Sequence, residues 1–217
     1  MHQIFKIPLI KQLHKIAANY YHSFLTAKKG KEIIRDWLKE GKPIPPPHVY
    51  KQLVVINKRE EYKLKTLIET GTYLGDMVYA CHSHFEQINS IELDKTLAFK
   101  AQERFKKFKH IKILQGDSSD ELLAILSEIN SPVLFWLDGH FSEGITAKGK
   151  LNTPILQELA HIFNHHVKNH VILIDDARCF NGTDDYPTLE ELKSIVDIQI
   201  PILNFEVKDD IIRIIPN

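Results

Sequence analysis

Residues Thr66–Gly75, TLIETGTYLG, decide the fold class of this 217-residue chain. A short apolar run leads into an acid, Glu69, and then into two glycines, Gly71 and Gly75. This order is typical of a buried parallel strand that turns through glycine into a helix. We therefore expect a strand that ends at Glu69, a glycine turn, and a helix that begins at Asp76.

The same pattern of an apolar run followed by an acid recurs along the chain. The further runs are INSIE ending at Glu92, IKILQGD ending at Asp117, VLFWLD ending at Asp138, and VILIDD ending at Asp175 and Asp176. Helical patterns separate these runs, and the C-terminus indicates an antiparallel hairpin with strands Asn204–Val207 and Ile211–Ile215. The alternation predicts a doubly wound α/β fold, a mostly parallel sheet that ends in a hairpin.

The expected boundaries follow from periodicity and helix-start signals. The predicted strands are Thr66–Glu69, Gln87–Leu93, Ile111–Gln115, Val133–Leu137 and Val171–Ile174, and the predicted helices are Asp76–His84, Lys95–Lys107, Asp120–Ile129, Pro154–His165 and Thr188 to about Val196. Four histidines on or after one helix, at 161, 165, 166 and 170, are expected on a solvated face.

The first 47 residues predict a helical N-terminal extension. Isoleucines and leucines recur at threes up to residue 16, and a second helix is expected over Gly30 to Glu40. The proline-rich stretch Gly41–His48 cannot be a helix interior, so we expect a linker there and the main domain over residues 48–217. The extension is expected to pack on the domain, to bind a partner or to pair two copies as a homodimer, and membrane docking is the least favoured role.

The composition limits the classes of partner. Lys and Arg together number 28, as do Asp and Glu, so no global basic field favours nucleic acid or an anionic membrane. No apolar stretch reaches the length of a membrane span, and no signal peptide is expected. The two cysteines, Cys81 and Cys179, lack metal-type spacing and indicate reduced thiols in a cytoplasmic protein.

Acids at strand ends predict a ligand site, because ligands of open α/β sheets bind beyond the carboxyl ends of the strands. Glu69 would repel a pyrophosphate but suits a cationic amino-acid group. Glu92 is placed to accept hydrogen bonds from a ribose diol. Asp94 could do this instead or cap the next helix, and Asp117 could accept from an adenine amino group or cap its own helix.

Asp138, Asp175 and Asp176 follow two strands that are expected to be neighbours. Three like charges in one crevice disfavour ionisation unless a cation is present. A hard divalent ion with oxygen ligands, most plausibly Mg²⁺, would relieve this repulsion. The alternative needs no ion: Asp176 would bond to Arg178 and to backbone amides.

From about Lys65 to Asn217 the chain contains five motifs in a fixed order: E-T-G-T-x-x-G, I-E-L-D, G-D-S, L-D-G-H and I-D-D. This order resembles that of the class I S-adenosylmethionine-dependent methyltransferases. The resemblance implies that the methionine part of the cofactor contacts the first motif. It also implies that the ribose contacts Glu92 and that the adenine contacts the third motif. The cofactor-binding residues implied are Glu69, Thr70, Gly71, Thr72, Gly75, Glu92, Asp117, Ser118 and Asp138.

The acidic triad is similar to that of the metal-dependent O-methyltransferases of the catechol and macrolide-sugar types. This likeness implies that Asp138, Asp175 and Asp176 hold the ion, and that Asp138 and His140 are the catalytic residues. The sugar-type enzymes carry an Asp at the position of His140, so a base, a metal ligand and a structural histidine all stay open. A histidine base could take a hydroxyl proton near neutral pH.

The expected activity is transfer of a methyl group to a hydroxyl of a sugar or other small molecule. Two other classes remain. In a nucleotide-sugar glycosyltransferase the triad would hold Mn²⁺ on a diphosphate, which the charge of Glu69 disfavours. A non-catalytic protein of the same fold would bind S-adenosylmethionine without turnover.

Overall fold

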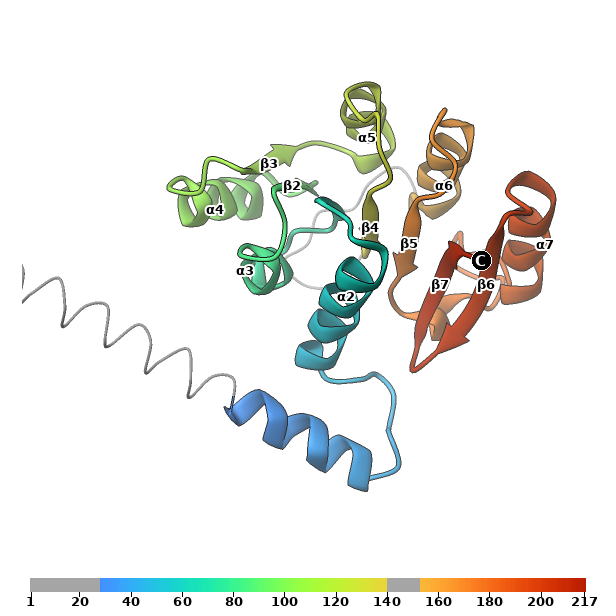
Figure 1. Cartoon of the computed structure of the whole chain (residues 1–217), viewed down its shortest axis with the longest axis horizontal. Helices are drawn as coiled ribbons and strands as arrows, with labels where there is room; N and C mark the ends of the chain where they lie inside the picture. The colour runs from blue at the N-terminus through green and yellow to red at the C-terminus, as the bar shows by residue number, and fades with distance from the viewer. Residues whose placement is uncertain (1–27, 140–152) are drawn as a thin grey trace, which may run out of the picture. The chain divides into compact units, whose positions relative to one another are not determined.

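A computed structural model describes residues 28–139 and 153–217 (Figure 1). The chain divides into two compact units, Met1–Tyr50 and Lys51–Asn217. Within the described part of the first unit, residues 28–39 are helical. The indole nitrogen of Trp37 donates a hydrogen bond to the Pro43 carbonyl at 2.8 Å, and the Trp37 ring lies 4.5 Å from that of Tyr50. These contacts tie the proline-rich segment to the helix that precedes it.

The second unit contains one seven-stranded sheet with the order β3-β2-β1-β4-β5-β7-β6. Its strands are β1 (Thr66–Thr70), β2 (Gln87–Glu92), β3 (Ile111–Gln115), β4 (Leu134–Leu137), β5 (Val171–Ile174), β6 (Leu203–Lys208) and β7 (Ile211–Pro216). The pairs among the first five strands are parallel, and β7 is antiparallel to both β5 and β6. The predicted doubly wound sheet with a terminal hairpin is confirmed.

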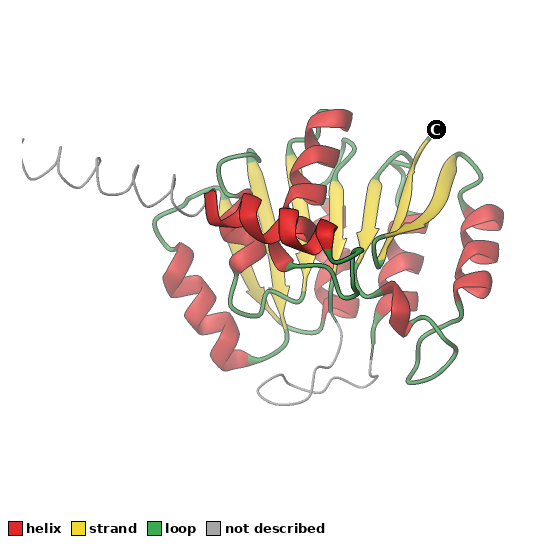
Figure 2. Cartoon of the chain, turned by 90° about the horizontal axis from the view of Figure 1, so that it is seen from below, coloured by secondary structure: helices red, strands yellow, loops and turns green. Residues whose placement is uncertain are grey.

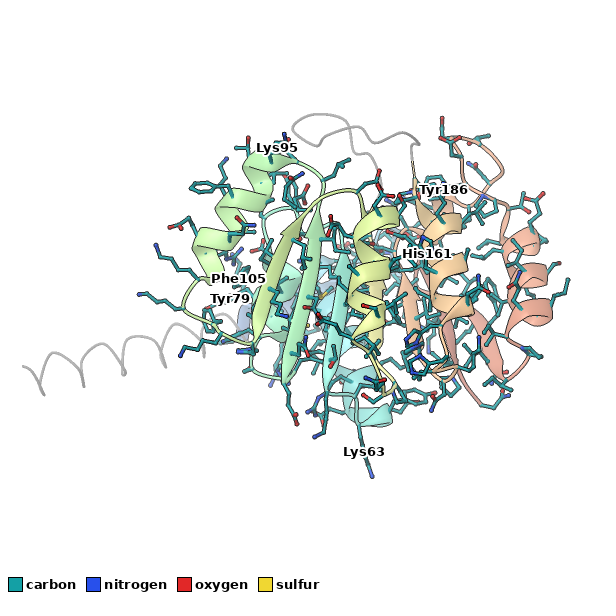
Figure 3. The ribbon with its side chains drawn as sticks, turned by 90° about the horizontal axis from the view of Figure 1, so that it is seen from above. Lys63, Tyr79, Lys95, Phe105, His161 and Tyr186 are labelled. Atoms are coloured by element: carbon teal, nitrogen blue, oxygen red, sulfur yellow. The ribbon has the colours of Figure 1, made fainter. Side chains whose placement is uncertain are left out.

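Helices cover both faces of this sheet (Figures 1 and 2). They are α2 (His48–Tyr62), α3 (Asp76–Cys81), α4 (Lys95–Phe105), α5 (Ser118–Ser127), α6 (Ile155–Asn164) and α7 (Leu189–Gln199), with a 3₁₀ turn η1 (Ala177–Cys179) after β5. Apolar side chains of α5, α6 and α7 form one continuous core with the sheet. Figure 3 shows α5 and α6 side by side on that face, and α3 lies on the opposite face.

Local signals explain most boundaries, and the structure corrects some of them. Thr188 and Glu191 form a capping box at the start of α7, where the sequence predicted that this helix begins. α5 begins at Ser118, two residues before the prediction, because Asp117 accepts a hydrogen bond from the Ser119 amide and caps it. The helix α2 was not predicted, since its sequence contains no capping signal and only a weak apolar stripe, with Val54 and Val55 buried.

The predicted solvated face of histidines is wrong for two of its members. His165 and His170 are buried, with exposed fractions of 9% and 1%. The Val133 amide donates to His170 Nδ1 at 3.2 Å, which assigns the proton of that ring to Nε2. Nε2 lies 3.0 Å from His165 Nδ1, and His165 Nε2 lies 3.0 Å from the Leu126 carbonyl. The His170 ring is therefore neutral, and burial lowers its pKa to about 4.

Within residues 28–139 and 153–217, no helix has the length and apolar character needed to cross a membrane.

Candidate active site

The site lies where the order of the strands reverses. The chain builds β1, β2 and β3 outward in one direction and then returns to place β4 on the other side of β1. Ligands of open α/β sheets bind at such a switch point, beyond the carboxyl ends of the strands. The Asp138 amide donates to the Thr70 carbonyl at 3.0 Å, so the loops after β1 and β4 begin in contact.

Gly71 is required by this close approach. Its φ is +83°, and a Cβ placed on it would lie 2.3 Å from the Asp138 carbonyl oxygen. Any other residue would therefore force the two loops apart and would adopt an unfavourable backbone conformation. Gly75 also has a positive φ, +78°, and precedes α3 as its N-cap. The glycine turn predicted from TLIETGTYLG is present as expected.

Glu69 lies beneath this loop. Its exposed fraction is 1%, and it accepts a short hydrogen bond from Ser90 Oγ, which is also 2.5 Å from Thr72 Oγ1. Burial raises the pKa of Glu69 to about 8, and the charges of Asp138 and Glu92 add to this effect. The carboxyl is thus a buried group that gains its charge most easily next to a cation.

Glu92 also contacts the glycine loop. Its Oε2 accepts from the Tyr73 amide at 2.7 Å, and its Oε1 accepts from the Asp94 amide at 2.9 Å. A carboxylate has about four lone-pair sites, so two remain for hydroxyl donors of a ligand. Asp94 caps α4, because its side chain accepts hydrogen bonds from the Thr96 and Leu97 amides, both at 2.8 Å. Of the two roles predicted for Asp94 from the sequence, these contacts are those of a helix cap.

Asp117 has the contacts of a helix cap. Its Oδ1 accepts from the amide and the hydroxyl of Ser119 at 3.0 and 2.7 Å. Asp117 is half-buried, whereas Ser118 is buried at the first position of α5. Both of these hydrogen bonds use Oδ1 and leave Oδ2 out of the cap. The adenine contact predicted for Asp117 stays a prediction.

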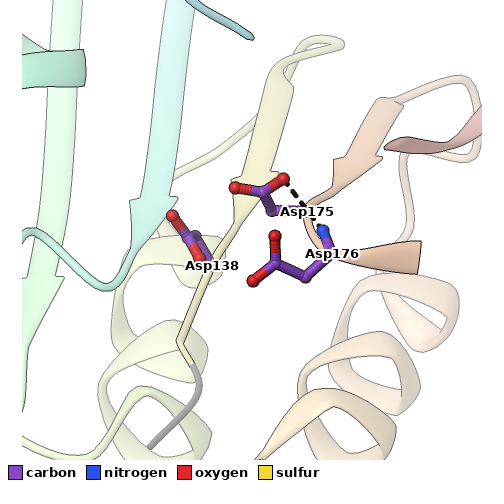
Figure 4. Close-up of side chains that lie close together, drawn as sticks. All are labelled: Asp138, Asp175 and Asp176. Atoms are coloured by element: carbon purple, nitrogen blue, oxygen red, sulfur yellow. Dashed lines mark hydrogen bonds between the residues drawn. The ribbon is translucent and has the colours of Figure 1, made fainter. Parts of the chain in front are cut away.

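Asp138, Asp175 and Asp176 come together as the sequence predicted (Figure 4). One carboxylate oxygen from each lies within 4.8 Å of the others. Asp176 has a φ of +56°, a left-handed conformation that is uncommon outside glycine, and its amide donates to Asp175 Oδ1 at 2.8 Å. Burial and the neighbouring charges of Asp138 and Asp176 raise the pKa of Asp175, and Lys51 opposes this shift.

Two basic side chains contact this triad. Lys51 Nζ lies 2.5 Å from Asp175 Oδ2 and 3.3 Å from Asp176 Oδ1. Arg178 donates to Asp176 Oδ1 at 2.7 Å and makes a short ion pair with Asp210 in the turn between β6 and β7. The contact between Asp176 and Arg178 is the one that the ion-free alternative predicted.

A small cavity lies between α6 and the ends of β4 and β5. Its lining includes Asp138, Asp175, Thr153, Tyr186 and Glu158, of which Tyr186 is labelled in Figure 3. Glu158 is 1% exposed, and burial raises its pKa to about 7 although the Ser118 and Thr70 hydroxyls lower it. Among the described residues, Glu158 Oε1 and Thr70 Oγ1 have no hydrogen-bond partner of normal geometry. Glu158 thus keeps one buried oxygen without a well-formed hydrogen bond, although the Thr70 and Ser118 hydroxyls lie close enough to lower its pKa.

Sequence reasoning missed Lys51, Ser90, Glu158 and Asp210. Only Glu158 carried a usable signal: it interrupts the apolar face of α6, three residues after Ile155 and four before Ile162. An acid on an apolar helical face predicts either a strong partner or a functional role. His140, the predicted base, lies outside the residues that the structure describes.

Comparisons with solved structures find the same fold in known proteins. The methyltransferase PaMTH1 of Podospora anserina, bound to S-adenosylhomocysteine, matches with a TM-score of 0.56 and 13% identity over 100% of both chains. The O-methyltransferase TomG of Streptomyces achromogenes, in complex with S-adenosylmethionine, matches with a TM-score of 0.55 and 10% identity over 87% of this chain and 89% of its own.

The chain has the class I methyltransferase fold. An O-methyltransferase of Bacillus cereus in complex with S-adenosylhomocysteine also matches, with a TM-score of 0.54 and 13% identity over 87% of this chain and 90% of its own. No protein-family model matches the sequence. No curated protein matches it either. The resemblance deduced from the ordered motifs is thus confirmed at the level of the fold.

Proposed function

We propose that this chain transfers the methyl group of S-adenosylmethionine to a hydroxyl oxygen of a sugar or another small molecule. The observation that carries the proposal is the juxtaposition at the β1–β4 switch point. A glycine loop with buried acids lies on one side, and three converging carboxylates, two of which line a small cavity, lie on the other. Methyl transfer needs this arrangement, because donor and acceptor must be held in line at close range.

The loop after β1 supports a nucleoside with a cationic amino-acid tail. Glu92 retains two lone-pair sites for a ribose diol, and Glu69 lies under the loop as a buried acid. Solved proteins of the same fold are described in complex with S-adenosylmethionine or S-adenosylhomocysteine. A diphosphate ligand is disfavoured, since the buried Glu69 carboxyl ionises most easily next to a cation and a diphosphate carries the opposite charge.

The triad is the proposed place of the acceptor hydroxyl and of a divalent ion such as Mg²⁺. Asp138, Asp175 and Asp176 offer the oxygen ligands that hard cations prefer, and the raised pKa of Asp175 is consistent with an excess of negative charge. When bound, the ion would polarise the acceptor hydroxyl and lower its pKa. Lys51 occupies part of this position, so the ion would have to replace its ammonium group.

The chemistry is a single displacement. The acceptor oxygen forms a bond to the methyl carbon, the carbon–sulfur bond breaks, and the electron pair stays on sulfur to give S-adenosylhomocysteine. The hydroxyl proton leaves to a base, for which His140 stays the predicted residue. The chain's contribution is orientation of the two substrates and exclusion of water from the cavity.

Calorimetric titration of the purified chain with S-adenosylmethionine and S-adenosylhomocysteine, in Mg²⁺ and again in EDTA, tests the proposal. Micromolar binding of both supports it, and transfer of a labelled methyl group to a panel of sugars and phenols would then identify the acceptor class. Folded protein that binds neither compound would refute it. Binding of a nucleoside diphosphate instead would support the glycosyltransferase alternative.

Binding of the cofactor without any transfer would support the third class, a non-catalytic protein. Activity that persists in EDTA would retain methyl transfer and remove the ion from it. The expected result for Asp175→Asn is loss of divalent-ion binding with cofactor binding retained, because Asp175 lies on the acceptor side of the switch point.

A further inference from the structure

Lys51 contributes a positive charge where the proposed function places a metal ion. It lies near the start of α2, 124 residues from Asp175 in sequence, and its side chain is only 12% exposed. Burial alone would lower the pKa of Lys51, but the charges of Asp175, Asp176 and Asp138 outweigh burial and raise it. Lys51 therefore makes two ion pairs with the triad, and little of its side chain contacts solvent.

The ammonium and a metal ion would need the same oxygen atoms. Asp175 Oδ1 is occupied by the Asp176 amide, and Oδ2 faces Lys51 Nζ at 2.5 Å. Asp176 Oδ1 is shared by Lys51 and Arg178. Mg²⁺ binds carboxylate oxygens at about 2.0–2.1 Å and tolerates little distortion. An ion bound to Asp175 Oδ2 would therefore lie against Lys51 Nζ, and repulsion between the two cations excludes joint occupancy.

A second feature indicates that the triad faces a ligand rather than only its own lysine. The same cavity is lined by Glu158, whose Oε1 atom is buried and lacks a hydrogen-bond partner among the described residues. Lys51 pairs with Asp175 and Asp176 from α2, whereas Glu158 joins the cavity lining from α6. A buried acid oxygen without a well-formed hydrogen bond therefore lines the same cavity as Asp138 and Asp175.

We propose that Lys51 is the resident cation of the acidic triad, and that a divalent ion binds only when the Lys51 ammonium leaves it. This inference rests on the proposed function for the ion itself, although not for the cofactor. Lys51 then determines the cation specificity of the site. It keeps Asp175 and Asp176 in place without metal, and it holds the affinity for divalent ions low.

Titration of Mn²⁺ into the full chain, followed by calorimetry and by the paramagnetic relaxation of water protons, tests the competition. Lys51→Met should bind Mn²⁺ at least tenfold more tightly than the wild type, and Lys51→Arg should not. Lys58→Met is the matched control, because Lys58 lies on the same helix and pairs with Glu61 rather than with the triad. Equal Mn²⁺ affinity in Lys51→Met and wild type, with both folded, would overturn the proposal.

The double variant Lys51→Met with Asp175→Asn assigns the gain to the triad, since it should lose the tighter binding. S-adenosylmethionine titration in EDTA is run on every variant. Wild-type protein that does not bind S-adenosylmethionine would refute the proposed function. Unchanged Mn²⁺ affinity in Lys51→Met would refute only the competition between the Lys51 ammonium and the divalent ion.

Wild-type protein supplies an independent measurement if Lys51→Met fails to fold. Acetylation by a water-soluble active ester, read by mass spectrometry, reports how freely each lysine amine reacts. Millimolar Mn²⁺ should accelerate labelling of Lys51 relative to EDTA and leave Lys58 unchanged, because the ion releases only Lys51. Labelling of Lys51 that is unchanged or slowed by Mn²⁺ would overturn the proposal.

Discussion

Glu158 provides a test of how strongly the cavity beside the triad is desolvated. Its carboxyl is fully buried on α6, and burial raises its pKa from the ordinary value of 4.5 to about 7. A carboxyl whose pKa is raised on folding stabilises the protein fully below its unfolded pKa, and this contribution is lost as the pH rises through the folded pKa. The wild type should therefore lose stability between about pH 4.5 and pH 7 because of this residue.

The substitution Glu158→Gln removes the titration and retains the shape. Each pKa unit corresponds to about 1.4 kcal/mol, so the 2.5-unit shift would cost the wild type roughly 3 kcal/mol once the group is ionised. Part of this cost is already present at pH 5. The free energy of unfolding of Glu158→Gln, relative to the wild type, should therefore increase by roughly 2–3 kcal/mol between pH 5 and pH 8.

Urea unfolding at both pH values, followed by circular dichroism, measures this change. The difference between the two pH values cancels any constant packing effect of the amide, so only the titration remains. Glu103→Gln, an exposed glutamate on α4, is the control and should show no comparable pH dependence. An offset between Glu158→Gln and the wild type that is equal at pH 5 and pH 8 would show that Glu158 is not desolvated.

Three further predictions concern the loops and the buried histidines. Gly71→Ala should lower Tm more than Gly41→Ala, because the two φ values are alike at +83° and +80° but only the first Cβ meets backbone. Glu92→Gln should weaken S-adenosylmethionine binding about 10- to 100-fold by calorimetry through loss of a charged diol acceptor, whereas Asp94→Asn should leave the affinity unchanged. Because the pKa of His170 is lowered to about 4, the wild type should lose stability as the pH falls from 6.5 towards 4. The stability difference between wild type and His170→Asn should accordingly shrink by about 2 kcal/mol from pH 7.5 to pH 5 in urea unfolding. A constant difference would contradict the neutral assignment of the ring.

Most of the sheet was predictable because its strands are short apolar runs bounded by turns and acids. The predicted limits of β3 and β5 agree with the structure, and β1 extends one residue beyond its prediction, to Thr70. The helix α2 was missed because its two buried valines give too weak a periodicity. The histidines at 165 and 170 were misplaced because polarity alone predicts exposure, and only the packing of α6 against the sheet buries them.

The sequence predicted which acids of the candidate site follow the ends of strands. It did not predict which side chains contact these acids. Glu92 and the triad lie where the sequence places them, since parallel strands end at one edge of a sheet. Asp117 and Asp94 each carried two interpretations, and their observed contacts are those of helix caps. No local pattern distinguishes an acid that caps a helix from one that also contacts a ligand, because both follow a strand and precede a helix.

The sequence by itself determined which carboxylates meet, because strand order and the direction of each strand bring Asp138 and Asp175 to one edge. Tertiary structure alone decided what balances their charge. Lys51 reaches Asp175 across 124 residues of sequence, and Glu158 enters the same cavity from α6. Burial sets the pKa of each group, and burial depends on every element that packs around it, so no spacing of residues in the chain encodes it.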